Sequence, residues 1–196
     1  MSQQAQGSTF ASASPAGEMA LAFYLGCLWP VWSGIAPHDQ ATVLVALGIG
    51  CAMTQLVAGV INLHKGNIMG NIMVAFSIFM WYGALEHLGK VQGWIPHNTL
   101  VVDGVIFGVM GLVMVILTIP HFTMPKAFTF FMIFTDGFFV PASLFFLTGN
   151  KVFKVIAGWD LPIMIIACVY CATGIMLNTY YGKEVMPMGK PFVTRA

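Results

Sequence analysis

The sequence predicts an all-α membrane protein with six transmembrane helices in each protomer. Of its 196 residues, 58% are hydrophobic and only 8% are charged, whereas soluble domains average about 25% charged residues. Eight basic and seven acidic side chains are too few to cover a soluble protein of this length, so most of the chain is expected in lipid. This composition argues against a soluble enzyme, a nucleic-acid-binding protein and a disulfide-rich secreted domain.

Six mainly apolar stretches are each long enough to cross the hydrocarbon core, which takes about 20 helical residues. In chain order they are Met19–Ile35, Ala41–Leu63, Ile68–Leu85, Leu100–Ile119, Ala127–Leu147 and Val155–Tyr181. The last stretch is the longest, so it must tilt or extend beyond the bilayer. We therefore expect a flexible tail over residues 1–18, a six-helix domain over 19–182 and a C-terminal tail over 183–196.

Each boundary between the spans has a local cause. Pro37 separates the first two spans, Pro96 lies between the third and fourth, and Pro125 lies between the fourth and fifth. Gly66 and Gly149 lie in the two tightest links, before the third and sixth spans. Proline and glycine at such positions indicate turns, because neither continues a helix readily.

The distribution of basic residues predicts the orientation in the membrane. With six spans, both termini lie on the same side. That side would hold Lys65, Lys126, Lys183, Lys190 and Arg195, against Lys90, Lys151 and Lys154 on the other side. Because basic residues concentrate in cytoplasmic loops, we expect a multi-pass protein of the cell membrane with cytoplasmic N- and C-termini.

Polar residues inside the spans are candidates for function, because burying them in lipid is costly. Asp136 lies well inside the fifth span, where it either lines a pathway and binds a proton or hydrogen-bonds a neighbouring helix. Gln55 and Asn62 lie seven residues apart and share one face of the second span. That face suits either a pathway wall or a close helix contact. Asn178 near the end of the sixth span either caps the helix or lines an exit.

The cysteines and histidines predict neither a metal site nor a cofactor. Cys168 and Cys171 form a C-x-x-C pair inside an apolar span, with no second pair to complete a metal site. They are better explained as small packing residues. The sequence also contains no clustered histidines or carboxylates that would suit a membrane enzyme.

The second and third spans carry a motif. The run from Gln55 to Gly70 reads QLVAGVINLHKGNIMG. It resembles the Q-x-x-A-G-x-x-E-x-x-K-G-N-x-x-G signature of the acetate uptake transporter family, to which bacterial succinate–acetate permeases belong. Ser14-Pro15-Ala16 is similar to the start of that family's N-P-A-P-L-G-L motif, and Ala157-Gly158-Trp159 is similar to an A-G-W at its last helix. The resemblance covers roughly Ser14 to Gly189.

This resemblance implies a ring-shaped homo-hexamer of six-helix protomers, each with its own pore. Members of that family carry acetate and related short carboxylates, including succinate, by a channel-like route or by proton symport. Their pore narrows at a Phe, a Tyr and a Leu, positions that correspond here to Phe23, Ser77 and Thr135. Ser and Thr side chains are smaller and more polar than Tyr and Leu side chains. A constriction formed by Phe, Ser and Thr would therefore be wider and would admit larger carboxylates.

Further departures concern the signature itself. The glutamate of the second span is Asn62 here, and Gly17-Glu18 replaces the second proline and leucine of the N-terminal motif. Amides and hydroxyls donate hydrogen bonds without a fixed charge, so an anion would be held weakly enough to leave. Gln55, Asn62, Ser77 and Thr135 are the expected donors, and Phe23 the expected apolar gate.

Two further residues complete the expected pathway. Asn67 lies where the third span begins, and free backbone N–H groups at such a helix start attract carboxylates. Asp136, next to the constriction, is the candidate for proton coupling, because burial would favour its neutral, hydrogen-bond-donating form.

Two other functions stay open at the level of the sequence. The chain could form a channel for another small solute, such as formate, ammonia or urea. It could also be a non-transporting membrane sensor.

Overall fold

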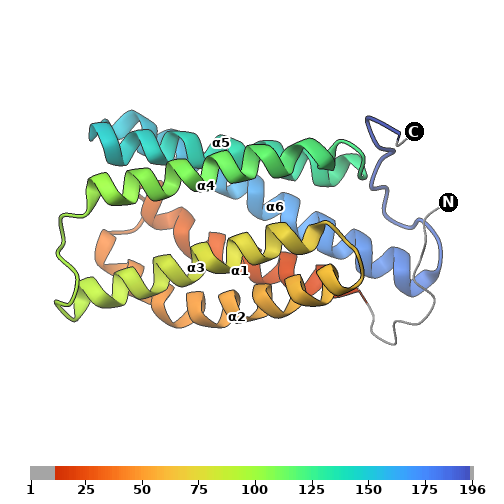
Figure 1. The fold of residues 1–196 in the computed structure, drawn as a ribbon, viewed down its shortest axis with the longest axis horizontal. Helices are drawn as coiled ribbons and strands as arrows, with labels where there is room; N and C mark the ends of the chain where they lie inside the picture. Colours follow the sequence, from red (N-terminus) through yellow and green to blue (C-terminus); the bar gives the residue numbers. More distant parts are fainter. Residues whose placement is uncertain (1–11, 195–196) are drawn as a thin grey trace.

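The computed structural model describes residues 12–194 as a bundle of six long helices (Figure 1). They are α1 Ser14–Trp32, α2 Val43–His64, α3 Met69–Val91, α4 Leu100–His121, α5 Lys126–Thr148 and α6 Lys151–Tyr181, with a short 3-10 turn, η1, at His38–Thr42. No strand occurs within residues 12–194. The prediction of an all-helical protein is confirmed. Residues 1–11 of the expected tail and Arg195 lie outside the described residues.

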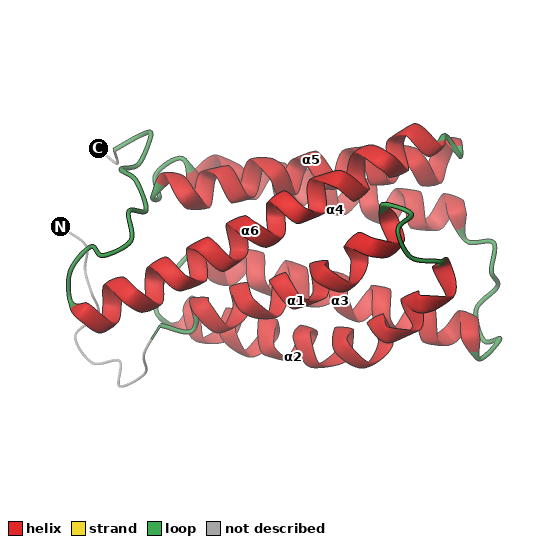
Figure 2. Ribbon diagram, turned by 180° about the vertical axis from the view of Figure 1, so that it is seen from behind, coloured by secondary structure: helices red, strands yellow, loops and turns green. Residues whose placement is uncertain are grey.

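The helices run up and down along one long axis. The links α1–α2, α3–α4 and α5–α6 gather at one end, which we call the α3–α4 end, and the links α2–α3 and α4–α5 lie at the other (Figure 1). The pairs α2 with α3, α1 with α6 and α4 with α5 share the most extensive contacts. Seen from behind, α6 crosses the bundle obliquely between α5 and α1 (Figure 2). The first and last helices of the chain therefore pack side by side.

Five of the six helices, α2 to α6, are long and apolar enough to cross a membrane. The exception is α1, which contains Ser14, Glu18, two prolines and two glycines. More than half of its residues are buried by the neighbouring helices, Glu18 among them at 3% exposure. A helix that is covered by protein need not be as apolar as one that faces lipid.

Three helix boundaries differ from the predicted spans. Helix α1 begins at Ser14 and not at Met19, so the last residues of the expected tail are helical, with Pro15 in the first turn, where its missing N–H costs nothing. Helix α3 continues past Leu85 to Val91 because Glu86 and Lys90 form an ion pair one turn apart. Helix α6 begins at Lys151 because the side chain of Asn150 caps it, accepting a hydrogen bond from Val152 N at 3.0 Å.

A close helix contact joins α2 to α3 through two glycines. A Cβ atom on Gly70 would lie 2.6 Å from the carbonyl oxygen of Gly59 and 2.7 Å from the backbone nitrogen of Leu63. Only a residue without a side chain allows the two backbones to approach this closely. The small residues of the QLVAGVINLHKGNIMG run therefore fix the spacing between α2 and α3.

The outer surface of the bundle is apolar. The residues of α4 that are more than half exposed include Val101, Val105, Val109, Leu112 and Ile116. In a membrane this surface faces lipid or other protein chains rather than water.

Candidate functional site

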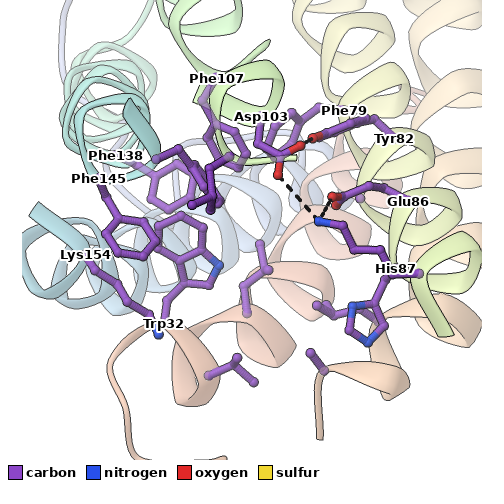
Figure 3. Close-up of a pocket in the computed structure, with 18 of the residues that line it drawn as sticks. Trp32, Phe79, Tyr82, Glu86, His87, Asp103, Phe107, Phe138, Phe145 and Lys154 are labelled. Carbon is purple, nitrogen blue, oxygen red and sulfur yellow. Dashed lines mark hydrogen bonds and ion pairs between the residues drawn. The ribbon is translucent and has the colours of Figure 1, made fainter. Parts of the chain in front are cut away.

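A cavity of about 290 Å³ opens at the α3–α4 end of the bundle (Figure 3). All six helices line it: α1, α3 and α5 from about their middle to their last turn, and α2, α4 and α6 with their N-terminal turns. His97, in the link between α3 and α4, is exposed and also lines the cavity. The cavity thus connects the bundle interior with the surface at this end.

One wall of the cavity is charged. Lys90 forms ion pairs with Glu86 and, at 3.5 Å between Nζ and Oδ2, with Asp103. Asp103 also accepts hydrogen bonds from the hydroxyls of Tyr82 at 2.6 Å and Thr99 at 2.7 Å. In Figure 3, dashed lines join Asp103 and Glu86 to a single ammonium group, and the two ion pairs identify it as that of Lys90. These contacts join α3 to α4 and use most of the hydrogen-bonding capacity of the wall internally. The wall contains two carboxylates and one ammonium group.

The facing wall is aromatic. The indole of Trp32 lies 5.4 Å from Phe138, 5.7 Å from Phe146, 5.8 Å from Phe107 and 6.1 Å from Phe145, measured between ring centroids. Aromatic pairs at these separations attract each other beyond simple burial. The ammonium group of Lys154, from the first turn of α6, lies 5.9 Å from the centre of the Phe145 ring (Figure 3). Lys154 therefore brings a positive charge to an otherwise apolar wall.

Two of the predicted pathway residues, Gln55 and Asn62, are buried on α2, each at 1% exposure. Asn62 joins three helices: its Oδ1 accepts from Ser14 Oγ on α1 at 3.3 Å, and its Nδ2 donates to Met73 Sδ on α3 at 3.2 Å. Gln55 differs, because its Oε1 has no hydrogen-bond partner among the described residues. Of the two amides, Gln55 has the free hydrogen-bonding capacity.

The three residues expected at the constriction are not brought to one cavity. Phe23 is 67% exposed and lines a shallow groove between α1 and α2. Ser77 is fully buried between α3 and α2, where its hydroxyl donates to the carbonyl of Ala52 at 2.9 Å. Thr135 is fully buried on α5, where its hydroxyl donates to the carbonyl of Phe131 at 3.0 Å. Both hydroxyls are thus satisfied by backbone, and the Phe23 ring points outward.

Both predicted asparagines at helix ends make local hydrogen bonds. Asn67 Oδ1 accepts from Met69 N at 3.1 Å, at the start of α3. Asn178 lies near the end of α6 and holds the C-terminal segment. Its Oδ1 accepts from the backbone nitrogens of Val185 and Met186, and its Nδ2 donates to the Met186 carbonyl at 2.8 Å.

Asp136 lies half-buried on α5 and faces α4. Its Oδ2 accepts a hydrogen bond from Thr118 Oγ1 at 2.9 Å, whereas Oδ1 has no partner among the described residues. No basic residue within 12–194 forms an ion pair with it. Asp160 on α6 also has an unpartnered oxygen and lies against Gly137.

The comparisons with known proteins rest on the fold. No protein-family model matches the sequence, and no curated protein matches it. A solved structure described as the bacterial acetate channel SatP superposes with a TM-score of 0.86 at 22% sequence identity, covering 92% of this chain and 100% of that chain. The chain has the SatP fold. This likeness confirms the six-helix fold of the protomer that the motif resemblance implied.

Within this SatP fold, no sequence pattern indicated the cavity. In the sequence, Lys90 and Lys154 are visible only as charges at the ends of spans. Asp103 and Trp32 fit the ordinary pattern of residues near a membrane interface. The spacing of Glu86 and Lys90, one helical turn apart, is the signal that could have indicated half of the charged wall. Nothing in the spacing of Trp32 and Phe145 indicates that they meet.

Proposed function

We propose that this protein moves acetate or a related short carboxylate across a membrane through a passage inside each protomer. The likeness to the bacterial acetate channel over that protein's whole length, at a TM-score of 0.86, carries the proposal. The cavity at the α3–α4 end supports it, because Lys154 brings to it an ammonium group that pairs with no carboxylate among the described residues. An anion cannot cross hydrocarbon unaided, and a positive charge at an entrance raises its local concentration.

Gln55 is the pathway residue with the strongest support. Its amide is buried near the middle of α2, and its oxygen accepts no hydrogen bond that would fix its orientation. Donation to a passing carboxylate would come from the Nε2 group of the same amide. The side chains of Asn62, Asn67, Ser77, Thr135 and Asn178 already serve the fold. These residues contribute to a pathway only if their hydrogen bonds rearrange. Phe23 gates the passage only if its exposed ring turns inward or meets another protomer of the hexamer that the family resemblance implies.

Flux measurements in liposomes test the proposed function. Purified protein reconstituted into liposomes is expected to take up labelled acetate in a saturable way, and other monocarboxylates should compete. The flux is compared with and without a proton gradient, and formate and urea are measured in parallel. Urea flux without acetate flux would favour the alternative of a different small-solute channel. Absence of any flux would favour a sensor.

Asp136 is proposed as the proton-coupling group, because its carboxyl lies inside the membrane span with one oxygen unpaired. The variant Asp136→Asn is expected to keep acetate flux down a concentration gradient but to lose its stimulation by a proton gradient. The same liposome assay measures both quantities. Asp160→Asn, which changes the other half-buried carboxyl with an unpaired oxygen, is the control and should keep the stimulation. Unchanged stimulation in Asp136→Asn would exclude this role.

We further propose that both termini are cytoplasmic, on the basis of the asymmetry in basic residues. A cysteine introduced at Lys190, in the C-terminal segment, is expected to react with a membrane-impermeant thiol reagent only after the cells are opened. A cysteine at Lys151, at the α3–α4 end, should react in intact cells. The opposite labelling pattern would reverse the orientation.

A further inference from the structure

We infer that the cavity at the α3–α4 end is a binding site for an aromatic or similarly bulky monocarboxylate, whose carboxylate binds Lys154 while its apolar part packs on the Trp32 wall. This inference rests on the proposed function, because it specifies the class of carboxylate that the protein recognises.

The size of the cavity is the first argument. Its volume of about 290 Å³ is close to the lower limit of about 300 Å³ for small-molecule sites. An acetate ion would fill only a small part of it and would leave the aromatic wall in contact with water. A benzoate-sized ligand would cover that wall, and burying apolar surface is favourable in proportion to its area.

The choice between the two lysines is the second argument. Lys90 is engaged by both Glu86 and Asp103, so a ligand carboxylate approaching it would also meet two like charges. Lys154 has no carboxylate within ion-pair distance among residues 12–194. Its ammonium group lies over the Phe145 ring, at the edge of the aromatic wall. An aromatic ligand whose carboxylate binds Lys154 would therefore place its ring against Trp32.

The orientation of the ligand follows from the two walls. The charged wall contains one more carboxylate than ammonium group, so it repels the negative end of the ligand toward Lys154. A monocarboxylate with an apolar tail fits this asymmetry, whereas a dicarboxylate would bring a second negative charge toward Asp103. The cavity thus selects for one charge and one apolar end.

Calorimetric titration of the purified full-length protein tests the ligand class with four probes. Benzoate is expected to bind at least about tenfold more tightly than acetate, which lacks the ring, and than benzyl alcohol, which lacks the charge; about tenfold corresponds to about 1.4 kcal/mol. Benzylamine, with the same ring and the opposite charge, should bind more weakly than benzoate. Equal affinities for benzoate and acetate, or tighter binding of benzylamine, would overturn the inference.

Two lysines at the start of α6 supply a matched pair of variants. Lys154→Gln is expected to weaken benzoate binding at least about tenfold and to leave the affinity for benzyl alcohol unchanged. Lys151→Gln removes the same charge from an exposed position outside the cavity and should change neither affinity. Lys154→Arg keeps the charge and should retain benzoate binding, so it remains informative if Lys154→Gln does not fold. Unaltered benzoate binding in a folded Lys154→Gln protein would overturn the inference.

Acetate flux, measured in liposomes on the same preparations, separates this inference from the proposed function. Saturable acetate flux without preferential benzoate binding would reject the inference and keep the function. Benzoate binding that depends on Lys154, without flux of any carboxylate, would keep the binding site and reject transport.

Discussion

Replacing Gln55 by leucine is expected to abolish most acetate flux while leaving the helix bundle folded. Gln55 is buried at 1% exposure in the middle of α2, and its Oε1 has no partner. Leucine has a similar size and no polar atoms, so the fold loses no satisfied hydrogen bond at that oxygen. The substitution also removes the Nε2 group, which is the part of the amide that can donate to a passing carboxylate, and a hydrogen bond to a charged group contributes about 1.5–3 kcal/mol. Flux should therefore fall at least about tenfold.

The measurement is initial acetate uptake into liposomes, normalised to folded protein. Thr54→Ala is the control, because Thr54 is the neighbouring residue, is exposed, and donates only to the carbonyl of Gly50 on its own helix. This control should transport normally. Normal flux in Gln55→Leu would remove Gln55 from the pathway, and loss of folded protein would show that the amide serves packing.

The second large effect is expected for stability. Gly70→Ala should destabilise the protein strongly, because the added Cβ would lie 2.6 Å from the Gly59 carbonyl oxygen and 2.7 Å from the Leu63 nitrogen. Backbone atoms cannot move aside as a flexible side chain can, so α2 and α3 must separate. Overpacking typically costs about 1–3 kcal/mol, and a contact with backbone should cost at least the upper part of that range.

Gly50→Ala is the matched control for this prediction. Gly50 also lies in a helix, on α2, but a Cβ there has nothing within 4 Å. Alanine stabilises helices relative to glycine by about 1 kcal/mol, so this variant should melt at the same temperature as the parent or slightly above it. Thermal melting in detergent should show a loss of several degrees for Gly70→Ala alone. Equal melting temperatures would mean that α2 and α3 lie farther apart.

Most of the fold could be predicted because five helices are long and mainly apolar. Prolines and glycines between the helices predicted where the links lie. Gly149 ends α5 in a left-handed conformation, and Asn150 caps the start of α6. The boundaries of α1 were harder to predict, because Ser14 and Glu18 are polar residues that become buried only when other helices cover them. Hydropathy along the sequence does not show that a helix from a distant part of the chain will cover a polar residue.

The candidate site was predictable only in part. The amides of Gln55 and Asn62 were visible as polar residues on one helix face, and the structure buries both. The cavity, by contrast, forms where six helix ends meet. The contact between Lys90 and Asp103 depends on how the α3–α4 link folds, and the one between Trp32 and Phe145 on how α1 and α5 pack. Neither is encoded in a local spacing.

The packing of α1 against α6 has a consequence for how the protein is made. Helix α1 leaves the ribosome first, but it is less apolar than the others, and it carries Glu18. Its covering partner α6 is synthesised last, and the two meet so closely that a Cβ on Gly158 would lie 2.8 Å from the Ser33 nitrogen. A charged side chain in a membrane helix opposes insertion, most strongly at the helix centre, and Glu18 lies in the second turn of α1. The nascent chain thus cannot cover α1 fully until α6 has been synthesised, so we expect the first helix to reach its final packing only after the last.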